Sequence, residues 1–356
     1  MIVSLDGIRR CGGPAGEEDG MKLTRFKWLA AGAAVLVLFL AGICVGRYPL
    51  TPGEVLRAVG QGLLSRPLGA SPEAVAIVMG NRLPRALMGA LVGAALAVSG
   101  CAFQALFRNP LVSQGILGVS SGAGFGAALS ILLLSGTAPT PLFAFFFGVV
   151  AVLLSFLVAR MSGEATTLML VLGGTVISSI FSALVSLLKY VADPYNQLAS
   201  IVFWNMGSLA SLESGVFPWS AAAMGAGVLL LFLLGQTLNV LSMGEDEARS
   251  LGLSTGTARF LVISGATLAT AGAVSLAGTI GWIGLIVPHM ARFLIGSDNR
   301  RLLPFSALLG ASFLMLIDLL CRTLTGGEIP LGILTSLIGG PFFIYLLRRF
   351  KGRGWK

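Results

Sequence analysis

Long apolar stretches alternate along the chain with short polar breaks that are rich in glycine, proline and charged residues. Most of the stretches have the length of roughly 17–25 residues that a helix needs to cross a bilayer. Only helices and closed barrels satisfy their backbone groups in hydrocarbon, and stretches this long favour helices. The pattern therefore predicts an all-α polytopic membrane protein of about ten transmembrane helices. We expect the spans at about 28–46, 83–107, 115–134, 142–159, 167–190, 217–238, 260–277, 282–295, 303–324 and 331–347.

The two ends of the chain are polar. Residues 1–24 are charged and glycine-rich and have no apolar periodicity, so we expect a disordered cytoplasmic tail there. Residues 25–350 form a single transmembrane domain in this interpretation. Residues 351–356 form a short, basic cytoplasmic tail.

One polar stretch, Ser242–Gly256, lies between the sixth and seventh predicted spans. Ser242 is a candidate N-cap, and three consecutive acids follow it in what would be the first turn of a helix. Gly252 and Gly256 are expected to end that helix. The stretch thus predicts a short amphipathic helix at about 243–253, which offers a surface against which a soluble protein can push.

Composition agrees with a membrane protein and gives its orientation. Hydrophobic residues make up 55% of the chain and charged residues 11%, whereas about a quarter of a soluble domain is charged. The formal net charge of +9 comes largely from Lys and Arg gathered before the first span and after the last. This distribution predicts that both termini are cytoplasmic and that the polar helix lies on the same side. It also argues against nucleic acid as a partner.

Motifs for catalysis or metal binding are missing from the sequence. The four cysteines are scattered and there is one histidine, so no metal site is predicted. Neither a phosphate-binding loop nor a zinc-protease or nucleophile-elbow motif occurs. We therefore expect no catalytic residue and no cofactor in this chain, and any energy from ATP must come from another polypeptide.

Polar residues inside the spans are the remaining candidates for function. Ser178, Ser182 and Ser186 recur every four residues on one helical face, where they either line a pathway or pack against another helix. Asp318 lies four residues before Arg322, and the pair gives each charge a partner. Because no second deep acid is present to form a relay, proton coupling is disfavoured.

Several segments, taken together and in order, resemble the FecCD-type permease family. These are the membrane subunits of type II ABC importers for iron-siderophores, haem and cobalamin. The matching segments are Arg82–Arg85, Gly93–Gly100, Gln104–Leu111, Leu117–Gly124, Val202–Ser208, Glu247–Gly252 and Ile283–Arg292. The likeness extends over roughly residues 25–350.

The resemblance implies a set of partners. It implies a homodimer in the cell inner membrane, two cytoplasmic ATPase subunits that carry ATP and Mg, and an external substrate-binding protein. By the same analogy the polar helix is the coupling helix that docks on the ATPase, through Glu245, Glu247, Ala248, Arg249, Leu251 and Gly252. The residues that would dock the binding protein are Arg82, Arg85 and Arg322. The residues that would close the inner gate are Asn109, Leu111, Thr166 and Thr167.

Two alternatives to this function remain. One is an autonomous secondary transporter coupled to protons or sodium, and the other is a membrane-embedded enzyme or channel. Among cargoes, the resemblance favours an iron-siderophore, with haem, cobalamin or an oxyanion left open.

Overall fold

Helices account for all the regular secondary structure in the computed structural model, which describes residues 14–66, 68–134, 139–161, 166–210 and 216–350. The all-α prediction is therefore confirmed. The elements are α1 (Pro14–Cys44), α2 (Pro52–Leu64), α3 (Pro72–Ile77), η1 (Val78–Arg82), α4 (Leu83–Leu106), α5 (Val119–Leu134), α6 (Thr140–Arg160), α7 (Thr167–Val191), α8 (Gln197–Met206), α9 (Phe217–Leu233), α10 (Gly235–Met243), α11 (Glu245–Ser250), α12 (Thr255–Ala277), α13 (Ile283–Ile295), α14 (Asn299–Thr323) and α15 (Leu331–Phe350).

Each of the ten predicted spans lies largely in helix, the sixth in two helices, and the helices differ in length. Within the described residues, six are long and apolar enough to cross a membrane alone, and α9 with α10 is a seventh that bends by 57°. The apolar helices at Val119–Leu134, Ile283–Ile295 and Leu331–Tyr345 are shorter. The bundle thus combines full spans with partial ones.

The first helix begins earlier than the pattern predicted. Helix α1 starts at Pro14, so residues 14–24 are helical rather than part of a loose tail. Proline is tolerated in the first turn of a helix, so the helix can begin at Pro14. Residues 1–13 and 351–356, the outer parts of the two predicted tails, lie outside the described residues.

Two other boundaries also differ from the prediction. The second span does not begin near Leu83, because α3, η1 and α4 form one helical run of 35 residues from Pro72. The π-helical turn η1 precedes Pro84, and such a turn lets a helix continue past a residue that lacks an N–H. The sixth span is not one helix, since Leu234 leaves helical geometry and α10 starts at Gly235.

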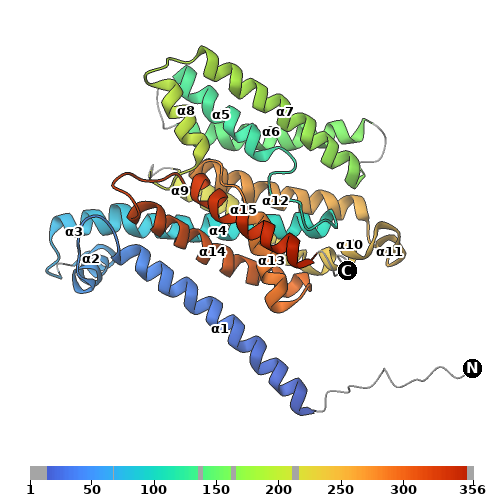
Figure 1. The fold of residues 1–356 in the computed structure, drawn as a ribbon, viewed down its shortest axis with the longest axis horizontal. Helices are drawn as coiled ribbons and strands as arrows, with labels where there is room; N and C mark the ends of the chain where they lie inside the picture. Colours follow the sequence, from blue (N-terminus) through green and yellow to red (C-terminus); the bar gives the residue numbers. More distant parts are fainter. Residues whose placement is uncertain (1–13, 67, 135–138, 162–165, 211–215, 351–356) are drawn as a thin grey trace, which may run out of the picture.

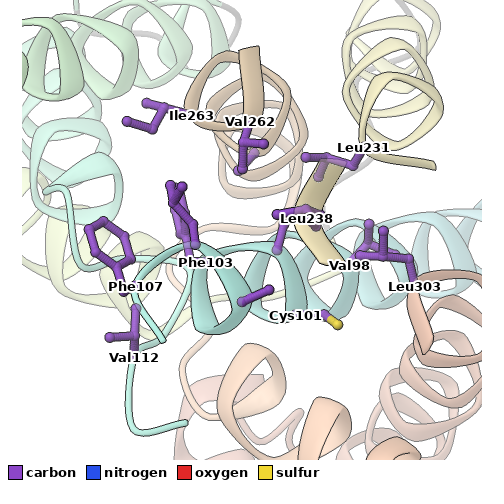
Figure 2. Packing of buried hydrophobic residues seen from close by; sticks show 14 of the residues in the cluster. Val98, Cys101, Phe103, Phe107, Val112, Leu231, Leu238, Val262, Ile263 and Leu303 are labelled. Atoms are coloured by element: carbon purple, nitrogen blue, oxygen red, sulfur yellow. The ribbon is translucent and has the colours of Figure 1, made fainter. Parts of the chain in front are cut away.

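Helix α4 lies at the centre of the bundle, and 18 of its residues are buried. Figure 2 shows Cys101, Phe103 and Val98 of α4 surrounded by apolar side chains from the neighbouring helices. At two further places α4 contacts a neighbouring helix directly through main-chain atoms. A β-carbon on Gly100 would lie 2.0 Å from the carbonyl oxygen of Gly284 in α13, and one on Gly310 of α14 would lie 2.3 Å from that of Gly93. Only glycine permits these approaches.

Figure 1 shows the two sides and the two ends of the bundle. Helix α1 lies along one side and α7 along the opposite side. The helices α2 and α3 lie at one end, and α10 and α11 lie at the other together with the last turn of α15. The beginning of α1 points to this second end, so the described ends of the chain lie on the side of α11.

Candidate functional site

The polar turn between α10 and α12 contains the predicted coupling helix, which the structure places at Glu245–Ser250 as α11. Its N-cap is Gly244 with φ +146°, and Ser242 is not the cap. Ser242 belongs to the last turn of α10, where its hydroxyl donates to the Leu238 carbonyl at 2.6 Å. Side chains rarely adopt a φ of this kind, so the backbone conformation of Gly244 is what makes the turn require glycine.

The end of α11 is only partly as predicted. Gly252, with φ +79°, follows its last turn and stops the helix in the left-handed conformation. Gly256 does not act as a breaker, because it lies inside α12.

The predicted coupling residues divide between an inner and an outer face of α11. Ala248 is fully buried against the bundle. Glu245 accepts from Arg249 at 3.1 Å and from Arg259 of α12 at 3.0 Å, and the Arg259 side chain is only 11% exposed. These contacts hold α11 onto α12. The residues that face outward are Glu247, Arg249, Leu251 and Gly252.

A second polar cluster fixes the bend between α9 and α10. The Asn239 amide donates to Asp298 at 2.7 Å, and its oxygen accepts from the backbone N–H of Asn299 at 2.8 Å. The hydrogen bond from Asn239 holds the pKa of the Asp298 carboxyl below its usual value. Helix α10, which leads into α11, is thus tied to the start of α14.

The predicted inner-gate residues occupy two separate turns. Asn109 and Leu111 are exposed in the turn after α4, where the Asn109 side chain accepts from the Leu111 N–H at 2.9 Å. Thr166 caps α7 by accepting from the Met169 N–H at 3.3 Å, and Thr167 is the first residue of α7. Among the described residues no hydrogen bond joins the two pairs, so their shared role as a gate stays a prediction.

Side chains of α13 contact α4 and the turn that follows it, and the sequence alone did not reveal these contacts. The ring of His289 contacts the Pro110 carbonyl at 2.8 Å. Nearby, Arg292 donates to the Gln104 side chain at 2.6 Å. The signal in the sequence was a histidine and an arginine within an apolar run, where each requires a polar partner.

The serine stripe of α7 lies mostly on its open face. Ser178 is half-buried, whereas Ser182 and Ser186 are exposed. The Ser186 hydroxyl donates to the Ser182 carbonyl at 3.0 Å, so within this chain it is satisfied by its own helix. This chain leaves the face uncovered, so it is open either to a pathway or to a contact with another helix.

The three arginines predicted to dock the binding protein lie near the end of α1, but they are buried. Their exposures are 4% for Arg82, 5% for Arg85 and 8% for Arg322. Arg82 donates to the carbonyls of Ile43, Cys44 and Tyr48 at the end of α1. Arg322 donates to the carbonyl of Gly42 at 2.7 Å. Two arginines thus satisfy the last carbonyls of α1 and complement its dipole.

Arg85 is enclosed by acids. It contacts Asp318 at 2.8 Å, and its two terminal nitrogens reach the two oxygens of Glu328 at 3.0 and 3.1 Å. Asp318 also lies 3.5 Å from Arg322. Glu328, in the loop before α15, was not among the sequence candidates. The three arginines are therefore engaged within the chain, and their role in docking a binding protein is not tested by these contacts.

The chain matches the model of the FecCD transport family over residues 34–349. It is 40% identical over 331 residues to the molybdate import system permease protein MolB of Haemophilus influenzae, an alignment that covers 91% of this chain and 96% of that protein. It is also 40% identical over 276 residues to an iron chelatin transport system permease protein of Helicobacter pylori, with 78% and 83% covered.

The fold has a solved counterpart. The structure, described as an inward-facing conformation of a metal-chelate type ABC transporter, superposes with a TM-score of 0.80 at 37% identity. The match covers 90% of this chain and 98% of the other. The polar turn at one end, the bundle of full and partial spans and the similarity to these relatives all indicate the same class of membrane protein. The chain belongs to the FecCD transport family and is a membrane-embedded permease subunit of an ABC importer, not an enzyme, with ATP hydrolysis carried out by a separate subunit.

Proposed function

We propose that two copies of this chain form an importer in the cell inner membrane that alternately opens an axial pathway to each side. Two cytoplasmic ATPases supply the force through α11, and an external binding protein delivers the cargo. Helix α11 and both ends of the chain are cytoplasmic in this proposal, in accordance with the distribution of Lys and Arg.

The observation that carries the proposal is the geometry of α11. Its inner face is fixed by buried Ala248 and by the contact between Glu245 and Arg259, while Glu247, Arg249 and Leu251 face outward. A helix attached in this way transmits a push from a soluble partner to α12 instead of absorbing it.

The open face of α7 supports a second copy as partner. Leu168, Leu172, Val176, Ile180 and Leu187 are each at least half exposed, and exposed serines lie among them. Small polar residues such as serine are typical of helix faces that pack against another membrane helix or line a hydrated pathway. We place the two-fold axis along this face.

The contacts of the outer arginines limit how an external binding protein could dock, compared with what the sequence suggested. An acidic residue of the binding protein would reach Arg85 by replacing Glu328, whose side chain is 30% exposed, rather than Asp318, which is 6% exposed. Secondary transport by proton coupling is not favoured, because both carboxylate oxygens of Asp318 are engaged by arginines, one by Arg85 and the other by Arg322.

The coupling proposal is tested by copurification of the ATPase with the full chain. We expect the double substitution Glu247→Ala with Arg249→Ala to abolish copurification, because it removes two of the outward charges of α11. The matched control is Arg300→Ala with Arg301→Ala, two exposed arginines at the start of α14 outside α11. Full retention of the ATPase by the α11 variant would refute the coupling role.

For the cargo we propose a metal chelate, a ferric siderophore, and as the second candidate the oxyanion molybdate. The two relatives named for an iron chelatin and for molybdate are equally similar to this chain, so identity does not separate these cargoes. Uptake of radioactive ferric siderophore and of molybdate, compared in cells with and without the intact gene, separates them. We expect iron uptake to fall; a fall in molybdate uptake alone would reverse the order.

A further inference from the structure

Helix α2, which follows α1 at the outer end, carries two apolar faces. One face holds Val55 and Ala58, buried at 4% and 0% exposure against the packing around α3 and η1. The other face holds Leu56, Leu63 and Leu64, with exposures of 71%, 67% and 64%. Leu63 and Leu64 follow Leu56 by seven and eight residues, a spacing that places all three on one side of a helix. The helix is well formed, with a capping box between Thr51 and Glu54.

The exposed leucines continue an apolar surface that begins on α1. The most apolar window of α1 is only 17% buried, and Leu36, Val37 and Leu40 are among its exposed side chains. Val45 and Tyr48, which are 44% and 52% exposed, lie on the connection from α1 to α2. Because α1 lies on the side of the bundle opposite α7, this surface is remote from the face assigned to the second copy (Figure 1).

We propose that α2 is an interfacial helix that inserts Leu56, Leu63 and Leu64 into the outer leaflet of the bilayer. A helix of this kind lies in the membrane plane with its apolar face ~5–10 Å into the boundary between headgroups and acyl chains. The surface formed by Val45, Tyr48, Leu56, Leu63 and Leu64 is called the outer apolar surface below.

Charged and aromatic residues around the outer apolar surface fit the headgroup region. Arg47, Arg57 and Arg66 are all exposed beside it. Arginine side chains near a membrane boundary extend to the phosphate level, and tyrosine is favoured there. These residues distinguish a lipid boundary from a dry protein interface, in which charged residues are depleted at the core.

The proposal does not depend on the cargo or on the coupling helix. The function of α2 would be to fix the outer end of α1 relative to the membrane surface while other helices move. A failure of the ATPase test above would leave this proposal unaffected, and its own failure would leave the ATPase proposal unaffected.

The experiment uses the full chain in vesicles of phosphatidylcholine and phosphatidylglycerol. The four native cysteines are replaced by alanine, and single cysteines are introduced by Leu63→Cys, Glu73→Cys or Leu36→Cys and labelled with a fluorophore that reports polarity. All three positions are exposed, so each label leaves the packing intact. Glu73 on α3 is the matched aqueous control, and Leu36 on α1 is the deep control.

The measured quantity is the quenching of the fluorophore. Three quenchers are compared: lipids with a spin label near the headgroup, lipids with a spin label near the chain end, and iodide in the water. We expect the Leu63 label to be quenched by the shallow spin label about twofold more than the Glu73 label, and to be shielded from iodide. We expect the Leu36 label to respond to the deep spin label. Equal iodide quenching at Leu63 and Glu73, without quenching by lipid, would overturn the proposal.

The other possible occupants of the surface give distinct results. If a second copy covers α2, the Leu63 labels of two chains quench one another in vesicles and cross-link, and lipid quenching is absent. If the binding protein covers it, the label is exposed to iodide until that protein is added. Either result would overturn insertion into lipid.

Discussion

The two ends of the bundle both carry charged clusters that the sequence assigned to soluble partners, and the structure treats them in opposite ways. At the end that holds α2 and α3, the outer end in our proposal, Arg82, Arg85 and Arg322 are buried and bonded within the chain. At the other end α11 uses Glu245 as its tether and leaves Glu247 and Arg249 exposed. A cluster of charge in a sequence thus indicates either a docking surface or an internal clamp, and the positions of the counter-charges decide which.

The two clusters also differ in the stability that is lost when one of their members is removed. The outer cluster is an ion network with little contact to water, so removing one member leaves an uncompensated charge behind. The tether of α11 is partly solvated, with the Glu245 side chain 35% exposed, so its loss costs much less. Substitutions at the two ends should therefore fail in different ways, the outer ones in folding and the inner ones in coupling.

The largest expected effect is that of Arg85→Ala. It leaves Asp318, which is 4% exposed, beside a single remaining arginine, and we expect a loss of about 3–5 kcal/mol in stability. Thermal unfolding of the purified chain in detergent measures it. The matched control is Arg57→Ala on α2, an exposed arginine at the same end, for which we expect little change. A wild-type midpoint for Arg85→Ala would remove the distinction between the two ends.

This expectation changes how docking at the outer end should be tested. Reversing Arg85 or Arg322 to glutamate would bury an acid beside Asp318, and reversing Arg82 would bury one among carbonyl oxygens, so weaker docking would follow from misfolding alone. Glu328→Gln is the sharper variant, since it loosens the partner of Arg85 that is closest to water.

A smaller effect is expected for Arg259→Met, which cuts the tether of α11. The chain should fold, because Met fills the space of the arginine stem, but the association with the ATPase should weaken about fivefold, as expected for a loss of about 1 kcal/mol. Binding of the ATPase to the full chain in detergent measures it. Arg259→Lys, which keeps the charge, should restore part of the affinity. If Arg259→Met binds normally, Glu245 does not position α11.

Most of the helices could be predicted from hydrophobic pattern alone, because bilayer thickness fixes their length. The helical run before Leu83 was missed because Pro84 and two arginines have the appearance of a boundary, whereas η1 lets the helix continue. The break at Gly235 was missed because Leu234 and Gly235 lie within an apolar run, and the bend is fixed by contacts of α10 with Asp298 and Asn299 in the α14 region.

The candidate site was harder to predict because its partners are distant in sequence. Arg85 is 233 residues from Asp318 and 243 from Glu328, so no local pattern links them. The contact between Glu245 and Arg259 spans 14 residues across a turn, which helical periodicity does not reveal. The residues of α11 were identified by resemblance and local composition, and the structure adds which of them face outward.

The close approaches of Gly100 to Gly284 and of Gly93 to Gly310 have a consequence for motion. Main chains in direct contact cannot slide past one another without separating, so α4, α13 and α14 form a rigid body. A β-carbon on Gly122 or Gly126 of α5 would likewise lie 2.3 Å from a carbonyl oxygen of α6, so opening of a passage must take place between such glycine-joined groups of helices and not within them. Glycines at the centre of the protein would thus determine which of its helices move together as one body.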